Sequence, residues 1–251
     1  MYMYIYYWLS KVFNMSNHST NIINSAIATT IAELITLPIC TIKTNYQNSN
    51  SKSIITSIKT LYKNGGVLIF YKASVPAISS QVFTISSKYF LYRWLNEKNY
   101  YYSNKIINGM ISGILVSVFT HPMDVIKIHW QMTKPISTSF RTEGFGLLYR
   151  GYSKTIWKAS VGSALYFPLY DYANEYFQKP LYAALFSAVI STIIIQPIDY
   201  LKTRHIYGQQ LYQGLNPMIY YKGLTLNLMR VVPHFIIIMT TISYLDKIKL
   251  L

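Results

Sequence analysis

The sequence is poor in acidic residues and in charge altogether. Only 8 of its 251 residues are Asp or Glu, against 23 Lys or Arg, and charged residues make up 12% of the chain. Soluble domains carry about a quarter charged residues, so this composition disfavours a soluble globular protein. The single cysteine, Cys40, excludes an intrachain disulfide and with it a disulfide-stapled secreted scaffold.

The excess of basic residues gives a formal net charge of +15, which attracts nucleic acid, acidic lipid or an anionic solute. These residues are spread between apolar segments and form no run or recognisable nucleic-acid module, so we expect no nucleic-acid partner. Hydrophobic residues reach 51%, yet the mean hydropathy is only +0.21. This balance is typical of membrane helices with one face on lipid and the other on a polar interior.

Signals for enzymatic chemistry are missing as well. The chain has no nucleophile motif and no glycine-rich phosphate loop. Its five histidines show no metal-ligand spacing; they are His18, His121, His129, His205 and His234. We therefore expect no enzyme, no cofactor and no metal site.

Three proline-centred segments recur along the chain. They are LPICTIKTNYQ around Pro38, HPMDVIKIHWQ around Pro122 and QPIDYLKTRHI around Pro197, at steps of 84 and 75 residues (122 − 38 and 197 − 122). An aromatic–basic motif follows each, as YKA at 71–73, YRG at 149–151 and YKG at 221–223. Small residues spaced by four precede each proline, as in close membrane helix pairs; they are Ser25 and Thr29, Gly109 and Gly113, and Ala184 and Ala188.

These recurrences predict three tandem repeats, 19–103, 104–179 and 180–251, after an N-terminal extension, 1–18. The first fourteen residues are aromatic and resemble neither a transit peptide nor a secretory signal. We expect them to be an interfacial anchor, or to precede a start at Met15.

Each repeat supplies two spans of about 20 residues or more, enough to cross a bilayer. The predicted spans are 22–46, 73–95, 105–131, 152–177, 181–205 and 224–248, separated within a repeat by polar linkers such as 49–63 and 133–143. A proline inside a helix removes one hydrogen bond and kinks it, here at equal depth in the three odd-numbered helices. The sequence therefore predicts an all-α membrane protein with six transmembrane helices, threefold pseudosymmetry and a central cavity.

Charged residues recur beside each motif proline. Two residues after it stand Cys40, Asp124 and Asp199; five after it stand Lys43, Lys127 and Lys202; nine after it stand Gln47, Gln131 and Ile206. Ionised groups at membrane depth are costly unless they pair or face water. A local pair three residues apart on one helix is one interpretation. The other is a ring in which each acid pairs with the lysine of a neighbouring helix and closes the cavity floor, with glutamines bonding beneath the ion pairs.

The pattern Pro-x-Asp-x-x-Lys, with Gln further on and an aromatic–basic–Gly motif after the loop, resembles the mitochondrial carrier family over residues 19–251. The resemblance implies six helices around a cavity that opens alternately to the intermembrane space and the matrix of the mitochondrial inner membrane. It also implies that each acid pairs with the lysine of the preceding odd helix. Asp124 would then meet Lys43, Asp199 would meet Lys127, and Lys202 would lack a partner. Because Cys40 replaces the first acid, the resemblance implies a matrix gate of two ion pairs.

The resemblance also implies an outer gate and lipid sites. The outer-gate pattern falls on Tyr92-Arg93…Asn96, Tyr170-Asp171…Asn174 and Ile242-Ser243…Asp246, where only Asp171 carries the expected charge, so we expect a shallow outer gate. Free backbone N–H groups at helix starts bind phosphate. In the family such starts hold cardiolipin, which implies sites for this or another anionic lipid at Lys72, Arg150, Gly151, Lys222 and Gly223. Interfacial snorkelling of the basic side chains is the alternative.

The cavity residues follow from two counts. Glu33 precedes Cys40 by seven residues and so shares its inward face. Counting eight residues on from the basic residue of each aromatic–basic motif gives Ser80, Lys158 and Arg230, with Gln81 and Ala159 beside them. These positions match the family's substrate contact points. Two cations and one carboxylate predict an anionic or zwitterionic solute, and phosphate suits an Arg–Lys pair. Tyr166 and Trp157 are candidates for stacking on a base or, alternatively, for facing lipid.

We therefore expect a monomeric carrier that exchanges nucleotides, deoxynucleotides included. Glu33 and the segments RGYSKT and FPLYDY are similar to S-adenosylmethionine carriers, although Lys158-Ala159 stands where those usually have an Arg–acid pair. Amino-acid and carboxylate transport stay open. The alternative from another class is a carrier-like scaffold without transport, because both gates are incomplete.

Overall fold

The computed structural model describes residues 18–49, 53–98, 105–133 and 135–249. All regular structure in these ranges is helical. Six long helices dominate: α2 (His18–Asn48), α4 (Ser74–Lys98), α5 (Lys105–Gln131), α7 (Tyr152–Phe177), α8 (Pro180–Tyr207) and α9 (Leu224–Lys249). They confirm the six helices expected from the sequence, with boundaries close to those predicted.

The linkers within repeats carry short helices that were predicted only as polar stretches. Helix α3 (Ile54–Gly65) and the 3-10 helix η1 (Val67–Tyr71) follow α2, and α6 (Ile136–Glu143) and η2 (Gly144–Tyr149) follow α5. A third 3-10 helix, η3 (Pro217–Tyr221), precedes α9. In α3 the buried side chains are Ser57 and Leu61, one turn apart, so this helix covers the end of the bundle with one face.

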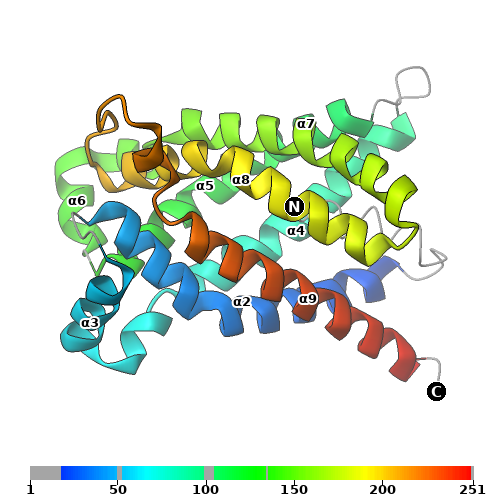
Figure 1. The fold of residues 1–251 in the computed structure, drawn as a ribbon, viewed down its shortest axis with the longest axis horizontal. Helices are drawn as coiled ribbons and strands as arrows, with labels where there is room; N and C mark the ends of the chain where they lie inside the picture. Colours follow the sequence, from blue (N-terminus) through cyan, green and yellow to red (C-terminus); the bar gives the residue numbers. More distant parts are fainter. Residues whose placement is uncertain (1–17, 50–52, 99–104, 134, 250–251) are drawn as a thin grey trace.

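The long helices form a closed ring in chain order. Each packs against the next, and α9 returns to pack against α2. The start of α2 and the end of α9 lie at one end of the molecule, while α3 and α6 lie at the other (Figure 1). The small residues Ser25, Thr29, Ala184 and Ala188 are buried, which allows this close approach of helices.

The motif prolines lie inside α2, α5 and α8, and each helix continues beyond its proline. Since proline lacks an N–H, each of these helices loses one backbone hydrogen bond at that point. Helix α2 bends part-way along its length in Figure 1.

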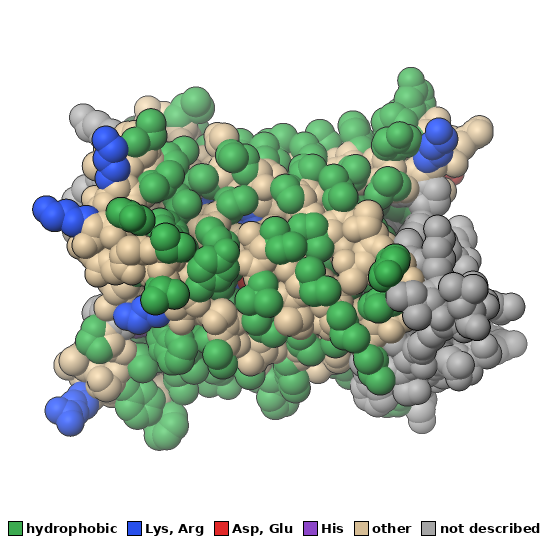
Figure 2. Space-filling model, turned by 90° about the horizontal axis from the view of Figure 1, so that it is seen from below, with side chains coloured by type: hydrophobic (Ala, Val, Ile, Leu, Met, Phe, Trp, Pro, Cys, Tyr) green, Lys and Arg blue, Asp and Glu red, His purple; other side chains and the backbone are tan. Residues whose placement is uncertain are grey.

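The outer surface is apolar between the two ends. Figure 2 shows hydrophobic side chains across the middle of this face and Lys and Arg gathered mainly at the end that carries the short helices. By length and composition, four segments of the described chain can cross a membrane: Ile23–Asn48, Ile107–Gln131, Leu181–Tyr207 and Pro217–Ile242. Helices α4 and α7 are as long but more polar, because they contribute Ser80, Thr84, Thr155 and Lys158 to an internal cavity.

Candidate solute-binding cavity and gate

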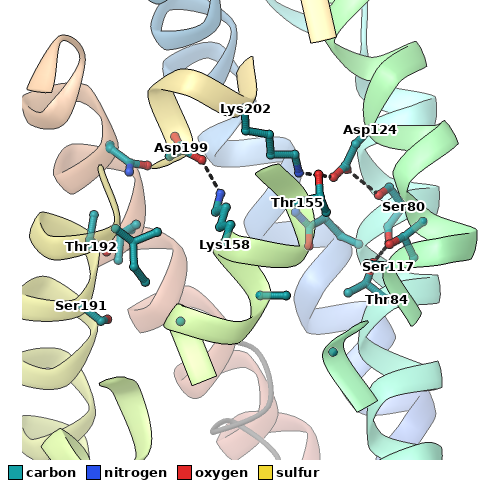
Figure 3. A pocket seen from close by; sticks show the side chains of 18 of the residues that line it. Ser80, Thr84, Ser117, Asp124, Thr155, Lys158, Ser191, Thr192, Asp199 and Lys202 are labelled. Atoms are coloured by element: carbon teal, nitrogen blue, oxygen red, sulfur yellow. Dashed lines mark hydrogen bonds and ion pairs between the residues drawn. The ribbon is translucent and has the colours of Figure 1, made fainter. Parts of the chain in front are cut away.

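A polar cavity of about 280 Å³ lies inside the helix ring (Figure 3). The four residues of α4, α7 and α9 that were predicted as solute contacts all line it, namely Ser80, Gln81, Lys158 and Arg230. Hydroxyl groups cover much of the remaining wall, from Thr84, Ser117, Thr120, Thr155, Ser191 and Thr192. The motif residues Asp124, Asp199 and Lys202 also reach the cavity. We call the layer of motif acids and lysines the floor.

The floor is held by ion pairs between different helices. Lys43 on α2 bonds Asp199 on α8, and Lys202 on α8 bonds Asp124 on α5 with Nζ 2.7 Å from Oδ2. The lysine–acid pairs therefore cross the cavity axis instead of forming locally on one helix. In the order α2, α5, α8 and back to α2, each acid meets the lysine of the next helix. The predicted direction, with Asp124 on Lys43 and Asp199 on Lys127, is therefore wrong.

Glu33 completes the floor where the motif lacks an acid. Lys127 Nζ lies 2.7 Å from Glu33 Oε1, while Cys40 is buried at the motif position itself. Glu33 is two turns away along α2, a distance that the four-carbon stem of lysine can span. Three floor ion pairs are thus present among the described residues, and Lys202 has a partner. The expectation of two pairs with Lys202 unpaired is wrong.

Three of the four predicted contact residues also bond one of these three acids. Ser80 donates to Asp124 at 3.0 Å, Lys158 bonds Asp199, and Arg230 Nη2 lies 2.7 Å from Glu33 Oε2. Each of the three acids is therefore shared by a floor lysine and a donor from α4, α7 or α9. We call these sets the three triads: Ser80–Asp124–Lys202, Lys158–Asp199–Lys43 and Arg230–Glu33–Lys127.

Glu33 is a buried counter-ion in this conformation and not a cavity wall residue. Its side chain is 0% exposed, and it contacts Lys127 and Arg230, with His234 Nδ1 3.9 Å from Oε2. A buried carboxylate is tolerated only when it is paired and hydrogen-bonded. The prediction that Glu33 faces the solute directly is not met here, because the two cations cover it.

The sequence comparisons agree with this architecture. The family model described as mitochondrial carrier protein matches residues 14–105 and 98–181. The chain belongs to the mitochondrial carrier family. Members of this family are transporters and not enzymes.

Several relatives of this carrier span nearly its whole length. A mitochondrial carrier-like protein of Acanthamoeba polyphaga mimivirus is 58% identical over 228 residues, covering 91% of this chain and 96% of the relative. The mitochondrial thiamine pyrophosphate carrier 1 of Kluyveromyces lactis is 22% identical, covering 85% and 86%. The mitochondrial 2-oxodicarboxylate carrier of Bos taurus is 24% identical, covering 82% and 86%. Two of these relatives are thus named for the solutes thiamine pyrophosphate and 2-oxodicarboxylate.

The two predicted glutamines lie beneath the floor but bond elsewhere. Gln131 Oε1 accepts from Thr44 Oγ1 at 2.8 Å, and Gln47 Nε2 donates to the carbonyl of Lys222 at 3.2 Å. They link α2 to α5 and to the start of α9 and are not bonded to the ion pairs in the described contacts. The equivalent Ile206 lies in an apolar cluster.

A second layer of hydrogen bonds joins the end of α2 to the ends of α5 and α8. Asn45 donates to the carbonyl of Gln131 at 2.7 Å, and Arg204 Nη1 donates to the carbonyl of Gln47 at 3.2 Å. Both donors stand seven residues after a motif proline (45 − 38 and 204 − 197), where the second repeat has His129. Sequence reasoning missed this layer because the three residue types differ and only their spacing repeats.

Asn227 on α9 is a further floor contact that sequence reasoning missed. Its amide oxygen accepts from Lys43 at 3.2 Å, and its amide nitrogen donates to Gln196 at 2.9 Å. Asn227 also lines the cavity, so it connects the wall with the floor. No repeat of residue type at this position marked it in the sequence.

The basic residues at the starts of even helices have different surroundings. Arg150 Nη1 pairs with both carboxylate oxygens of Glu143 at 2.7 and 3.0 Å, and Lys222 Nζ donates to the carbonyl of Ser49 at 2.6 Å. Lys72 instead borders a surface cavity of about 240 Å³. Two of the three predicted lipid cations thus bind protein groups.

The helix-start turns differ in the same way. Gly151 and Gly223 adopt left-handed conformations with φ of 79° and 86°, which favour glycine. The first repeat has Ala73 at this position, and Lys72 before it is right-handed helical, with φ −54° and ψ −32°. The repeat-one turn is therefore built differently from the other two.

Trp157 does not face the solute path. Its side chain is 62% exposed and is absent from the cavity lining, so the predicted stacking on a base is wrong for this residue. The side chains of Tyr166 and of the outer-gate residues Tyr92, Arg93, Asn96, Ser243 and Asp246 lie outside those that the structure describes, as does the extension 1–17. The shallow outer gate stays a prediction.

Proposed function

We propose that this carrier exchanges anionic metabolites across the mitochondrial inner membrane by alternating access, and that its solutes are nucleotides, deoxynucleotides included. The observation that carries the proposal is the sharing of acids in the triads. Lys158 and Arg230 line the cavity, and each is bound to an acid that also holds a floor lysine. An anion entering the cavity competes with those acids for both cations.

This competition couples solute binding to the matrix gate. When phosphate oxygens take Lys158 and Arg230, Asp199 and Glu33 keep only Lys43 and Lys127. The solute has then taken two of the four cations that held Asp199 and Glu33. Its binding energy offsets the separation of the remaining ion pairs. Without solute the triads re-form and hold the floor closed. The empty carrier is then hindered from changing state, which favours exchange over one-way transport.

The wall chemistry supports a polar solute with more than one anionic oxygen. Arg230 can bind two oxygens at once, while Lys158 acts as a compact point charge. The hydroxyl groups of Ser80, Ser191 and Thr192 and the amide of Gln81 suit sugar and base polar atoms. Two relatives are named for a pyrophosphate compound and a dicarboxylate, which share paired anionic groups. Carboxylates and amino acids are the alternative solutes. S-adenosylmethionine is less favoured, because Lys158 opposes a cationic ligand.

A transport-inactive scaffold is less well supported than a working carrier. It was motivated by two incomplete gates. In one of them, the floor, Glu33 supplies the acid that Cys40 lacks.

We also propose that a monomer binds cardiolipin or another anionic lipid at the starts of the even helices. Lys72 offers the most open site, since its surface cavity is bordered by Trp130, Thr133, Pro135 and Ile136. There an ammonium group lies next to an apolar ring, a combination that suits a lipid phosphate and its chain.

The test is transport by the purified carrier in liposomes, with a panel of labelled nucleotides, deoxynucleotides, amino acids, carboxylates and S-adenosylmethionine. We expect rapid uptake of labelled dATP only when unlabelled nucleotide is inside. Uptake of carboxylates alone would reject the nucleotide assignment. Failure of every compound would support the scaffold.

A further inference from the structure

A buried histidine stands beside the Glu33 triad and has no part in the function described so far. His234 on α9 is 1% exposed, and its Nδ1 lies 3.1 Å from Thr36 Oγ1 and 3.9 Å from Glu33 Oε2. The Thr36 hydroxyl donates to the carbonyl of Ala32 at 2.7 Å, so its oxygen is left to accept a proton from Nδ1. This arrangement puts a ring N–H next to the carboxylate.

Charged groups from three helices surround His234 while the floor is closed. Glu33 faces it from α2, Lys127 from α5 and Arg230 from its own helix. One carboxylate thus holds two cations, and a third positive charge on His234 would be repelled by both.

The transport cycle removes those cations from Glu33. In the proposed function the solute takes Arg230, and opening of the floor separates Lys127 on α5 from Glu33 on α2. Glu33, which is 0% exposed while both cations cover it, would then lose both of its counter-charges, which is unfavourable. His234 is already within 4 Å of it and can become positive by binding one proton.

We propose that His234 and Glu33 form a proton-binding site, and that this carrier takes up a proton together with its anionic solute. The inference rests on the proposed function, because the solute must withdraw Arg230. The proton comes from water on the side where the solute enters and binds the second ring nitrogen, giving an imidazolium that faces Glu33. It leaves when Arg230 returns to Glu33 after solute release.

The test counts protons bound with the solute. Calorimetric titration of the full-length carrier in detergent with dATP, in buffers of different ionisation enthalpy, gives the proton number per dATP at neutral pH. We expect the wild type to take up about one proton more than His234→Gln, since histidine is the side chain whose ordinary charge change falls in this range. Protonation of the phosphate itself cancels in this difference.

The matched control is His121→Gln. His121 on α5 is also a buried histidine, with its ring nitrogens against Thr155 Oγ1 and the carbonyl of Arg150. We expect this variant to keep the wild-type proton number. Equal proton numbers for wild type and His234→Gln would overturn the inference while leaving nucleotide exchange intact.

A second measurement covers the case in which His234→Gln does not fold. The wild-type proton number should fall as the pH is raised through the histidine range, and a constant number would overturn the inference. If the wild type neither binds nor exchanges dATP, the proposed function itself fails. The two failures are therefore separate results.

Discussion

Glu33 Oε1 lies 2.7 Å from Lys127 Nζ, and this bond closes a ring that the repeated motif leaves open at Cys40. Glu33 reaches the ring from two turns further along α2, where it also holds Arg230. The first repeat thus carries its acid two turns away from the motif position. Several properties of the carrier depend on this displacement.

Glu33→Gln should destabilise the matrix-closed carrier. The variant leaves Lys127 and Arg230 buried without their carboxylate, and breaking a buried pair costs about 3–5 kcal/mol. We expect a clear fall in the melting temperature of the detergent-solubilised protein. The rescue is Cys40→Asp in the same chain, because it returns an acid to the motif position near Lys127. If the double variant melts no higher than Glu33→Gln, the ring as described is wrong.

The two motif aspartates should differ in importance. Asp199 holds both Lys43 and Lys158, and its side chain is 6% exposed, whereas Asp124 holds Lys202 with a side chain that is 27% exposed. Asp199→Asn should therefore lower the melting temperature more than Asp124→Asn, which serves as its matched comparison. Equal shifts would mean that the second cation on Asp199 adds nothing.

Lys158→Ala and Arg230→Ala should each reduce nucleotide exchange severely. A lost charged hydrogen bond is worth about 1.5–3 kcal/mol, which corresponds to roughly 10- to 100-fold. The control is Lys154→Ala, one turn earlier on α7, because Lys154 is not in the cavity lining. Initial exchange rates in liposomes give the comparison. Full activity in both cavity variants would remove these cations from the solute site.

Cardiolipin should protect the carrier against heat, and Lys72→Ala should weaken that protection more than Arg150→Ala. Lys72 borders an open surface cavity, while the guanidinium of Arg150 is already bound to Glu143. For a chain of this size each 1 kcal/mol of binding free energy shifts the melting temperature by roughly 2–4 °C. Melting curves with and without added cardiolipin measure the difference. A larger loss in Arg150→Ala would contradict the assignment of the open site.

The helices were predictable because each carries a signal that needs no neighbour. The predicted spans 105–131 and 152–177 match the bounds of α5 and α7 to the residue. Helix α3 was missed because its buried face shows only at Ser57 and Leu61, within a stretch whose composition is polar. Short amphipathic helices are easily hidden in this way.

The pairing within the floor was not predictable from spacing. A three-residue step puts Asp124 and Lys127 on one helix face, but it does not say which neighbouring helix each side chain meets. That choice depends on the handedness of the helix ring and on the reach of lysine. The capture of Lys127 by Glu33 depends on both, and a motif read along one helix contains neither.

The bond from Arg204 to the carbonyl of Gln47 joins residues 157 positions apart, and it ties the end of α8 to the end of α2. Lys43 likewise finds its acid only in α8, and Glu33 finds Arg230 only in α9. During synthesis Lys43 and Glu33 therefore lack these partners until the last repeat has left the ribosome. Assembly of this carrier is expected to be an all-or-nothing event at the end of translation, and chains that stop before α8 should be degraded.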